Sequence, residues 1–154
     1  MTQISLCGSE LELHFQFKNE RLHFTQMRRG EHSLLQPGAV GNPLGVVISS
    51  GEHAGHYGPD SFRVTHLQHD ETSLLAYLQH DTLPLLFGLS VGVEGNVMSW
   101  RGQVGWNGAQ SVEIDFYFPL WSKVVLDSPD ADRAIFATLS GDVVGPRSRA
   151  DGRD

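Results

Sequence analysis

The most regular part of the chain, residues 97–118, alternates apolar and polar residues on either side of Asn107-Gly108. Apolar side chains occupy every second position from Met98 to Trp106, and again from Val112 to Phe118, apart from Gly102. A period of two is typical of β-strands with one buried and one wet face, because successive side chains point to opposite sides. Asn-Gly favours a two-residue turn, since both turn positions need a positive φ. The pattern therefore predicts an antiparallel hairpin over 97–118.

The same alternation recurs along most of the chain. It predicts further strands at 11–17, 22–25, 46–48, 62–64, 74–78, 85–93 and 135–139, with a short one at 33–36. Turn-forming residues separate these segments at about the 8–12-residue spacing of sandwiches and barrels. Residues 72–80 also fit a short helix, but the flanking turns favour a strand. Residues 1–10 are interpreted as a polar lead, and 49–59 as the longest loop.

These segments together predict an all-β protein. We expect an antiparallel β-sandwich of about ten strands, each burying its apolar face against a second layer. The predicted domain covers residues 1–145. Residues 146–154 are almost free of apolar side chains, and we expect a disordered polar tail there.

The net charge and the cysteine content indicate which partners and which cell compartment are compatible with this chain. Eighteen acidic and eleven basic residues give a net charge of −7, which disfavours nucleic acid and anionic membranes as partners. Neutral ligands such as sugars remain compatible with this charge. Cys7 is the only cysteine, so no internal disulfide forms, which favours a reducing compartment. With no signal peptide and no membrane span visible, we expect a cytoplasmic protein.

The 49–59 loop contains the clearest candidate polar cluster. His53 and His56 form an H-x-x-H pair, and Tyr57 follows directly. Zinc needs three or four ligands, and two histidines do not complete such a set, so the simpler interpretation is a pair of solvated loop histidines. We expect no metal and no cofactor, and keep His53, His56 and Tyr57 as candidate sugar contacts.

The three tryptophans are the largest apolar side chains. Trp100 and Trp106 share the phase of the apolar face, so packing in the core is the default expectation. Trp106 precedes the expected turn and Trp121 follows Pro119, so either side chain could reach the surface. An exposed aromatic plane is what the C–H face of a carbohydrate stacks on. Trp106 and Trp121 therefore join the candidate sugar contacts.

The order of three stretches resembles a known family. They are LELHFQFKNERLHF near the N-terminus, GNPLGVVI, and VEIDFYFPLWSKVVLDSPD after a Trp-bearing strand. Together they resemble the N-terminal β-sandwich domain of large glycoside hydrolases of the α-galactosidase-like superfamily, a galactose-mutarotase-like supersandwich. The resemblance implies a domain that packs beside a catalytic barrel without supplying its carboxylates. At about half the length of a full supersandwich, the chain would be a fragment, a truncated reading frame or a free-standing relative, and no mutarotase-type His/His/Glu set maps onto it.

The resemblance and the aromatic residues near turns favour a non-catalytic, carbohydrate-associated β-sandwich module. A second hypothesis is a structural protein that self-associates, because half a supersandwich would leave strand edges and apolar faces for another copy to cover. A third is a small sugar-active enzyme that uses the His53/His56 loop. The expected partners are carbohydrate and a second copy of the chain.

Overall fold

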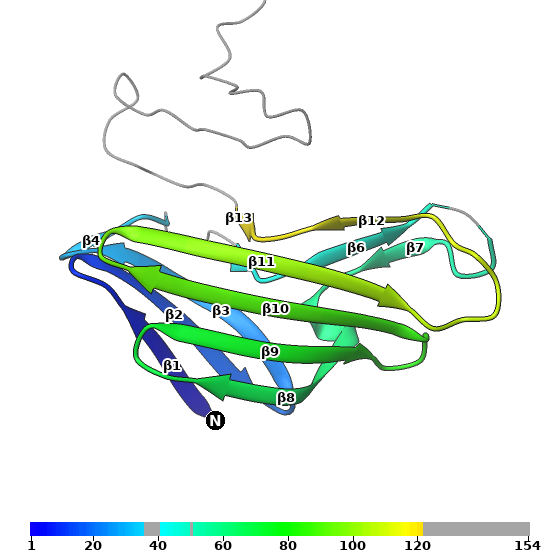
Figure 1. Ribbon diagram of the computed structural model, residues 1–154, viewed down its shortest axis with the longest axis horizontal. Coiled ribbons are helices and arrows are strands. Elements are labelled where there is room, and N and C mark those ends of the chain that lie inside the picture. The colour runs from blue at the N-terminus through cyan, green and yellow to red at the C-terminus, as the bar shows by residue number, and fades with distance from the viewer. Residues whose placement is uncertain (36–40, 50, 122–154) are drawn as a thin grey trace, which may run out of the picture. The chain divides into compact units, whose positions relative to one another are not determined.

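The protein is all-β in the part of the chain that its computed structural model describes, residues 1–35, 41–49 and 51–121. All strand pairings are antiparallel. The elements in Figure 1 are β1 (Thr2–Cys7), β2 (Leu11–Lys18), β3 (Arg21–Arg29), β4 (His32–Ser33), β5 (Gly41–Asn42), β6 (Gly45–Ile48), β7 (Gly55–Tyr57), the 3₁₀-helix η1 (Pro59–Ser61), β8 (Phe62–His69), β9 (Ser73–His80), β10 (Leu85–Glu94), β11 (Val97–Trp106), β12 (Ile114–Tyr117) and β13 (Leu120–Trp121). The predicted fold class, an antiparallel all-β sandwich, is confirmed.

The strands of the described residues form three sheets. One sheet has the order β1-β2-β3-β5-β13, with β4 paired to β3. A second has the order β11-β10-β9-β8, and a third has the order β12-β6-β7. The four-stranded sheet is a simple meander, so neighbours in sequence are neighbours in space (Figure 1).

The core lies between the four-stranded sheet and the other two. Phe15 and Phe24 of the first sheet pack against Trp100 of β11, with ring centroids 5.8 and 5.7 Å apart. At the other end, Phe87 of β10 meets Phe118, 6.2 Å away. Burying one such aromatic side chain is worth about 1.5–3 kcal/mol, so the alternation along each strand drives the layers together.

The predicted hairpin over 97–118 is wrong. β11 pairs with β10 through the tighter Gly95-Asn96 connection, where Gly95 has a φ of +60°, whereas β12 pairs with β6 in another sheet. Neither Asn107 nor Gly108 has a positive φ. The chain instead wraps around Trp106, whose indole Nε1 donates to Gln110 O at 2.8 Å. The pairing of β11 with β10 and of β12 with β6 outweighed the local preference of Asn107-Gly108 for a hairpin turn.

Three further interpretations need correction. Residues 2–7 are not a polar lead but β1, because Ile4 and Leu6 are fully buried against the core. The loop over 49–59 contains the short strand β7, which pairs with β6. The expected strand at 33–36 is reduced to β4, two residues long.

The other strand predictions within the described residues hold. Residues 72–80 form strand β9 rather than a helix. Between the strands predicted at 11–17 and 22–25, a tight turn joins β2 to β3, and its residues Asn19 and Glu20 have a positive φ, 51° and 59°. The strand expected at 135–139, the domain boundary at residue 145 and the polar tail over 146–154 lie outside the described residues.

Candidate functional site

Three of the five predicted contact residues lie together at one end of the sandwich. The Tyr57 hydroxyl donates to the backbone oxygen of His53 at 2.7 Å. The His53 ring lies 5.6 Å from the ring of Trp106. The sequence places these residues on β7, its preceding turn and the end of β11, and the sheets bring them together.

Internal contacts already engage the polar groups of this cluster. The Trp106 indole N–H is bonded to Gln110, and a Cβ on Gly108 would meet the same indole at 2.5 Å. The Tyr57 ring packs edge-on against His80, 4.8 Å away. These contacts fix the end of the sandwich, and the role of the cluster in sugar binding stays a prediction.

The remaining two predicted residues are not in contact with Trp106 in any described interaction. His56 is exposed on β7, opposite Val47, and lines a hollow of about 290 Å³ together with Tyr57 and Tyr117. Trp121 pairs through its backbone with Gly41 of β5, and its side chain lies outside the described residues.

Metal-ligating side chains do not gather in the described ranges. No group of three or more His, Cys, Asp or Glu residues there is close enough to hold an ion. His53 instead has a neighbouring carboxylate of Glu52 at 3.2 Å, and both side chains are partly exposed.

A larger candidate site lies on the outer face of the four-stranded sheet, the face turned away from the core. Along β10 the buried residues alternate with small outward-facing ones, Gly88, Ser90 and Gly92. Each small residue stands in a row between one residue of β9 and one of β11. The rows are Tyr77-Gly88-Gln103, Leu75-Ser90-Arg101 and Ser73-Gly92-Ser99. We call these nine residues the β10 groove.

Side chains on β9 and β11 form the walls of this groove. Tyr77 is 51% exposed, and Arg101 and Gln103 are exposed on the opposite wall. A hollow of about 390 Å³ is lined by Tyr77, Gly88, Ser90, Arg101 and Gln103, among others. From strand spacing and rise, the Cα atoms of Tyr77 and Arg101 are about 12 Å apart.

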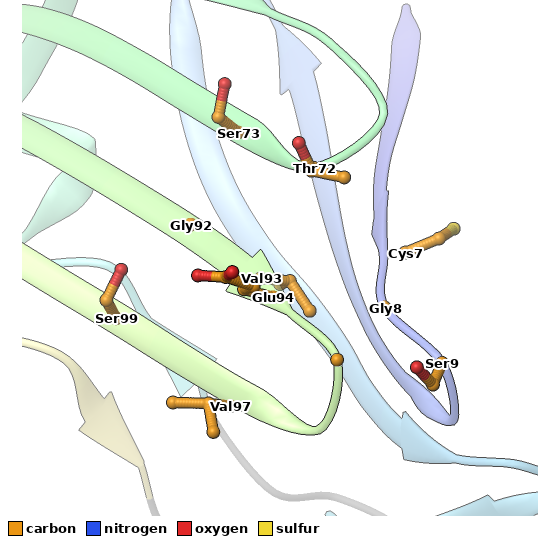
Figure 2. A pocket seen from close by; sticks show the side chains of 11 residues that line it. Cys7, Gly8, Ser9, Thr72, Ser73, Gly92, Val93, Glu94, Val97 and Ser99 are labelled. Atoms are coloured by element: carbon orange, nitrogen blue, oxygen red, sulfur yellow. The ribbon is translucent and has the colours of Figure 1, made fainter.

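A second hollow, of about 630 Å³, continues from the last row toward the turns at the end of the sheet. Figure 2 shows Ser73, Gly92 and Ser99 side by side on three neighbouring strands, with Thr72 directly before β9. Cys7, Gly8 and Ser9 bound this hollow from the turn between β1 and β2 (Figure 2). Its lining includes the hydroxyls of Ser9, Thr72, Ser73 and Ser99, and also the apolar side chains of Val93 and Val97.

Glycine keeps the groove open. An added Cβ on Gly88 would lie 3.6 Å from the Tyr77 ring and 3.9 Å from Gln103 Cβ, so a methyl group fits but takes up the floor. A Cβ on Gly92 would come within 3.0 Å of Ser99 Oγ. The letters Gly88-x-Ser90-x-Gly92 match a hydrolase nucleophile motif, but here they lie within a continuous strand and form a floor.

Some arginines among the described residues form ion pairs with carboxylates, and others do not. Arg21 forms a bidentate pair with Asp81, and its hydrogen bond lowers the pKa of that carboxyl. Arg29 lies 3.3 Å from Glu10, and Arg63 donates to Gln79. Arg101 makes no ion pair with any residue that the structure describes.

Asp70 fixes the turn beside the second hollow. Its carboxylate accepts from the backbone N–H groups of Thr72 and Ser73 and from both hydroxyls. The bonds from Thr72 and Ser73 lower the pKa of Asp70. The start of β9, which carries the hydroxyls of that hollow, is therefore held in place by one charged side chain.

Sequence reasoning missed the groove although its signal was present. Small residues at 88, 90 and 92 alternate with the apolar ones, and the prediction of a strand over 85–93 gave them no role in a site. The rows appear only when β9 and β11 are placed in register beside β10, and the sequence does not specify that register on its own.

Comparison of the chain with protein-family models, with curated proteins and with solved structures gives no match. Among the described residues, no helix has the length and apolar character needed to cross a membrane.

Proposed function

We propose that this chain is a non-catalytic carbohydrate-binding β-sandwich module, and that a glycan lies along the β10 groove. The observation that carries the proposal is the half-exposed Tyr77 ring standing over a glycine floor, opposite Gln103 and Arg101. An aromatic plane takes the C–H face of a sugar ring, while amide and guanidinium groups bond its hydroxyls.

The lining of the groove combines polar and apolar groups, which suits a sugar ring with its hydroxyl groups and its C–H faces. The groove offers the hydroxyls of Ser73, Ser90 and Ser99 together with the Tyr77 ring and the Leu75 side chain, and more of its lining is apolar than polar. The proposed glycosidase kinship of the chain points to the same ligand class.

A binding role, rather than hydrolysis, is favoured by the surroundings of Ser90. A serine nucleophile needs a base within hydrogen-bond reach. Ser90 lies between Leu75 and Arg101, and among the described residues no histidine or carboxylate is hydrogen-bonded to it.

The test is a glycan-array screen followed by calorimetric titration of the best ligand with two variants. Tyr77→Ala should abolish or strongly weaken binding. Tyr117→Ala is the matched control, because that tyrosine is equally exposed, 50%, but lies on β12. Binding lost only in Tyr117→Ala would move the site to the His56 hollow, and a folded protein that binds no glycan would overturn the proposal.

Self-association is a second candidate function, favoured by the edge of β11. Within the described residues this ten-residue strand pairs only with β10, and Arg101 is its one charged residue. Val97 at its start is 68% exposed. By contrast, β8 at the opposite edge has a bulge between Val64 and His66, a feature that discourages further pairing.

Sedimentation velocity over a range of protein concentrations tests this second candidate. A dimer that dissociates in a Gln103→Pro variant, but not in a Gln68→Pro variant on the opposite edge, would support pairing through β11. A monomer at all concentrations would rule it out.

A further inference from the structure

Arg101 lies on the β11 wall of the β10 groove, in the middle row, which it shares with Ser90 and Leu75. Its side chain is exposed, and it makes no ion pair with a described residue. Arg28 and Arg63 likewise form no ion pair with a described carboxylate, so Arg101 is distinguished by its place in the groove rather than by its lack of a partner.

The nearest carboxylate on the same face of β10 is Glu94, four residues along the strand from Ser90. Strand rise and spacing place the Cα atoms of Glu94 and Arg101 about 14 Å apart. At physiological salt the Debye length is about 8 Å, so Glu94 is largely screened from the guanidinium. The centre of the groove is therefore locally positive in a protein that is acidic as a whole.

A guanidinium group matches an oxyanion with two parallel N–H···O bonds, which lysine does not reproduce. The separation of about 12 Å between Tyr77 and Arg101 exceeds the width of one sugar ring, so the two groups meet different rings of one chain. The ring beside Arg101 would carry the oxyanion, and the ring beside Tyr77 would stack.

We propose that the β10 groove takes an acidic glycan, with a carboxylate or sulfate of one sugar held by Arg101 while another ring stacks on Tyr77. This inference rests on the proposed carbohydrate-binding function and names its ligand class. It also explains why the groove has one charged residue on a wall that is otherwise neutral.

Matched ligand pairs test the proposal. Oligogalacturonate is compared by calorimetric titration with its methyl ester of equal length, and sulfated galactan oligosaccharides with unsulfated ones. The acidic member of at least one pair should bind roughly tenfold more tightly, the effect of one charge-assisted hydrogen-bonded contact. The pair that shows the difference identifies the oxyanion as carboxylate or sulfate.

Variants of Arg101 test whether this residue causes the tighter binding of the acidic ligand. Arg101→Gln should remove the difference within the pair, and Arg101→Lys should restore only part of it. Arg28→Gln, on β3 of another sheet, is the control and should leave the difference unchanged.

The outcomes separate the two claims. Equal binding of acidic and neutral members, or an acidic preference that survives in Arg101→Gln, overturns this inference and leaves the glycan-binding function standing. If no member of either pair binds and the glycan array is also blank, the proposed function fails and the inference fails with it.

Discussion

The two faces of β10 differ sharply in side-chain size and burial. The inner face presents Leu85, Phe87, Leu89, Val91 and Val93, all buried. The outer face presents Gly88, Ser90 and Gly92, which leave room above the strand. One alternating stretch thus supplies both core residues on its inner face and the floor of the candidate site on its outer face. In the proposed function, ligand binding depends on the absence of large side chains at Gly88, Ser90 and Gly92.

The largest expected effect is on the inner face. Phe87 is fully buried and contacts the rings of Phe116 and Phe118. Phe87→Ala should lower the free energy of unfolding by about 3–5 kcal/mol, because it removes apolar burial and leaves a cavity. Urea denaturation followed by tryptophan fluorescence measures this loss. A cost below about 1 kcal/mol would show that the inner face is not packed as described.

A smaller effect concerns His80, the one polar residue buried on the inner faces of the described strands, 6% exposed. Its Nδ1 accepts from the backbone N–H groups of Thr82 and Leu83, at 3.1 and 3.0 Å. Burial lowers the pKa of His80 below its ordinary value, with Tyr57 and Phe62 packed around the ring. Protonation would also convert Nδ1 from acceptor to donor.

The sign of the pH dependence follows from this lowered pKa. Below about pH 6.5 the unfolded chain binds a proton at His80 that the folded chain excludes, so stability falls as the pH drops toward the folded pKa. The slope from one proton is at most about 1.4 kcal/mol per pH unit. Urea titrations at pH 7.5 and 5.5 should show a loss that is smaller in His80→Gln and unchanged in His66→Gln. Equal losses in all three proteins would contradict the assignment.

The smallest effect on stability is expected on the outer face. Gly88→Ala should leave the free energy of unfolding unchanged or raise it by about 0.5–1 kcal/mol, because glycine is costly within a strand. The same methyl group occupies the groove floor beside Tyr77, so glycan affinity should fall. Thermal unfolding and titration of one sample measure both. Unchanged affinity would show that the floor does not contact the ligand.

The sequence predicted the faces of single strands well and the relations between strands poorly. Alternation from Leu85 to Val93 identified the buried face of β10, because side-chain direction is a local property. The pairing of β12 with β6, and of β11 with β10, depends on partners distant in the chain, and a favourable Asn107-Gly108 turn was outweighed. For the same reason, the contact between His53 and Trp106 was not foreseen.

The same contrast between single strands and strand pairing explains why the candidate site was not predicted. Each wall residue looked like an ordinary exposed strand position, and only the register aligns Tyr77 with Gln103 across Gly88. The strand β1 was missed for another reason, since Ile4 and Leu6 are its only strongly apolar side chains apart from Cys7. A short edge strand gives too few alternations to be recognised alone.

The most direct test of the central claim is a two-dimensional ¹⁵N–¹H NMR titration with the best glycan from the array. The backbone amides of Tyr77, Gly88, Gly92 and Arg101 should shift together, while those of His53, Tyr57 and Tyr117 stay in place. Shifts confined to the second set, or no shift in either, would contradict the assignment of the β10 groove as the binding site.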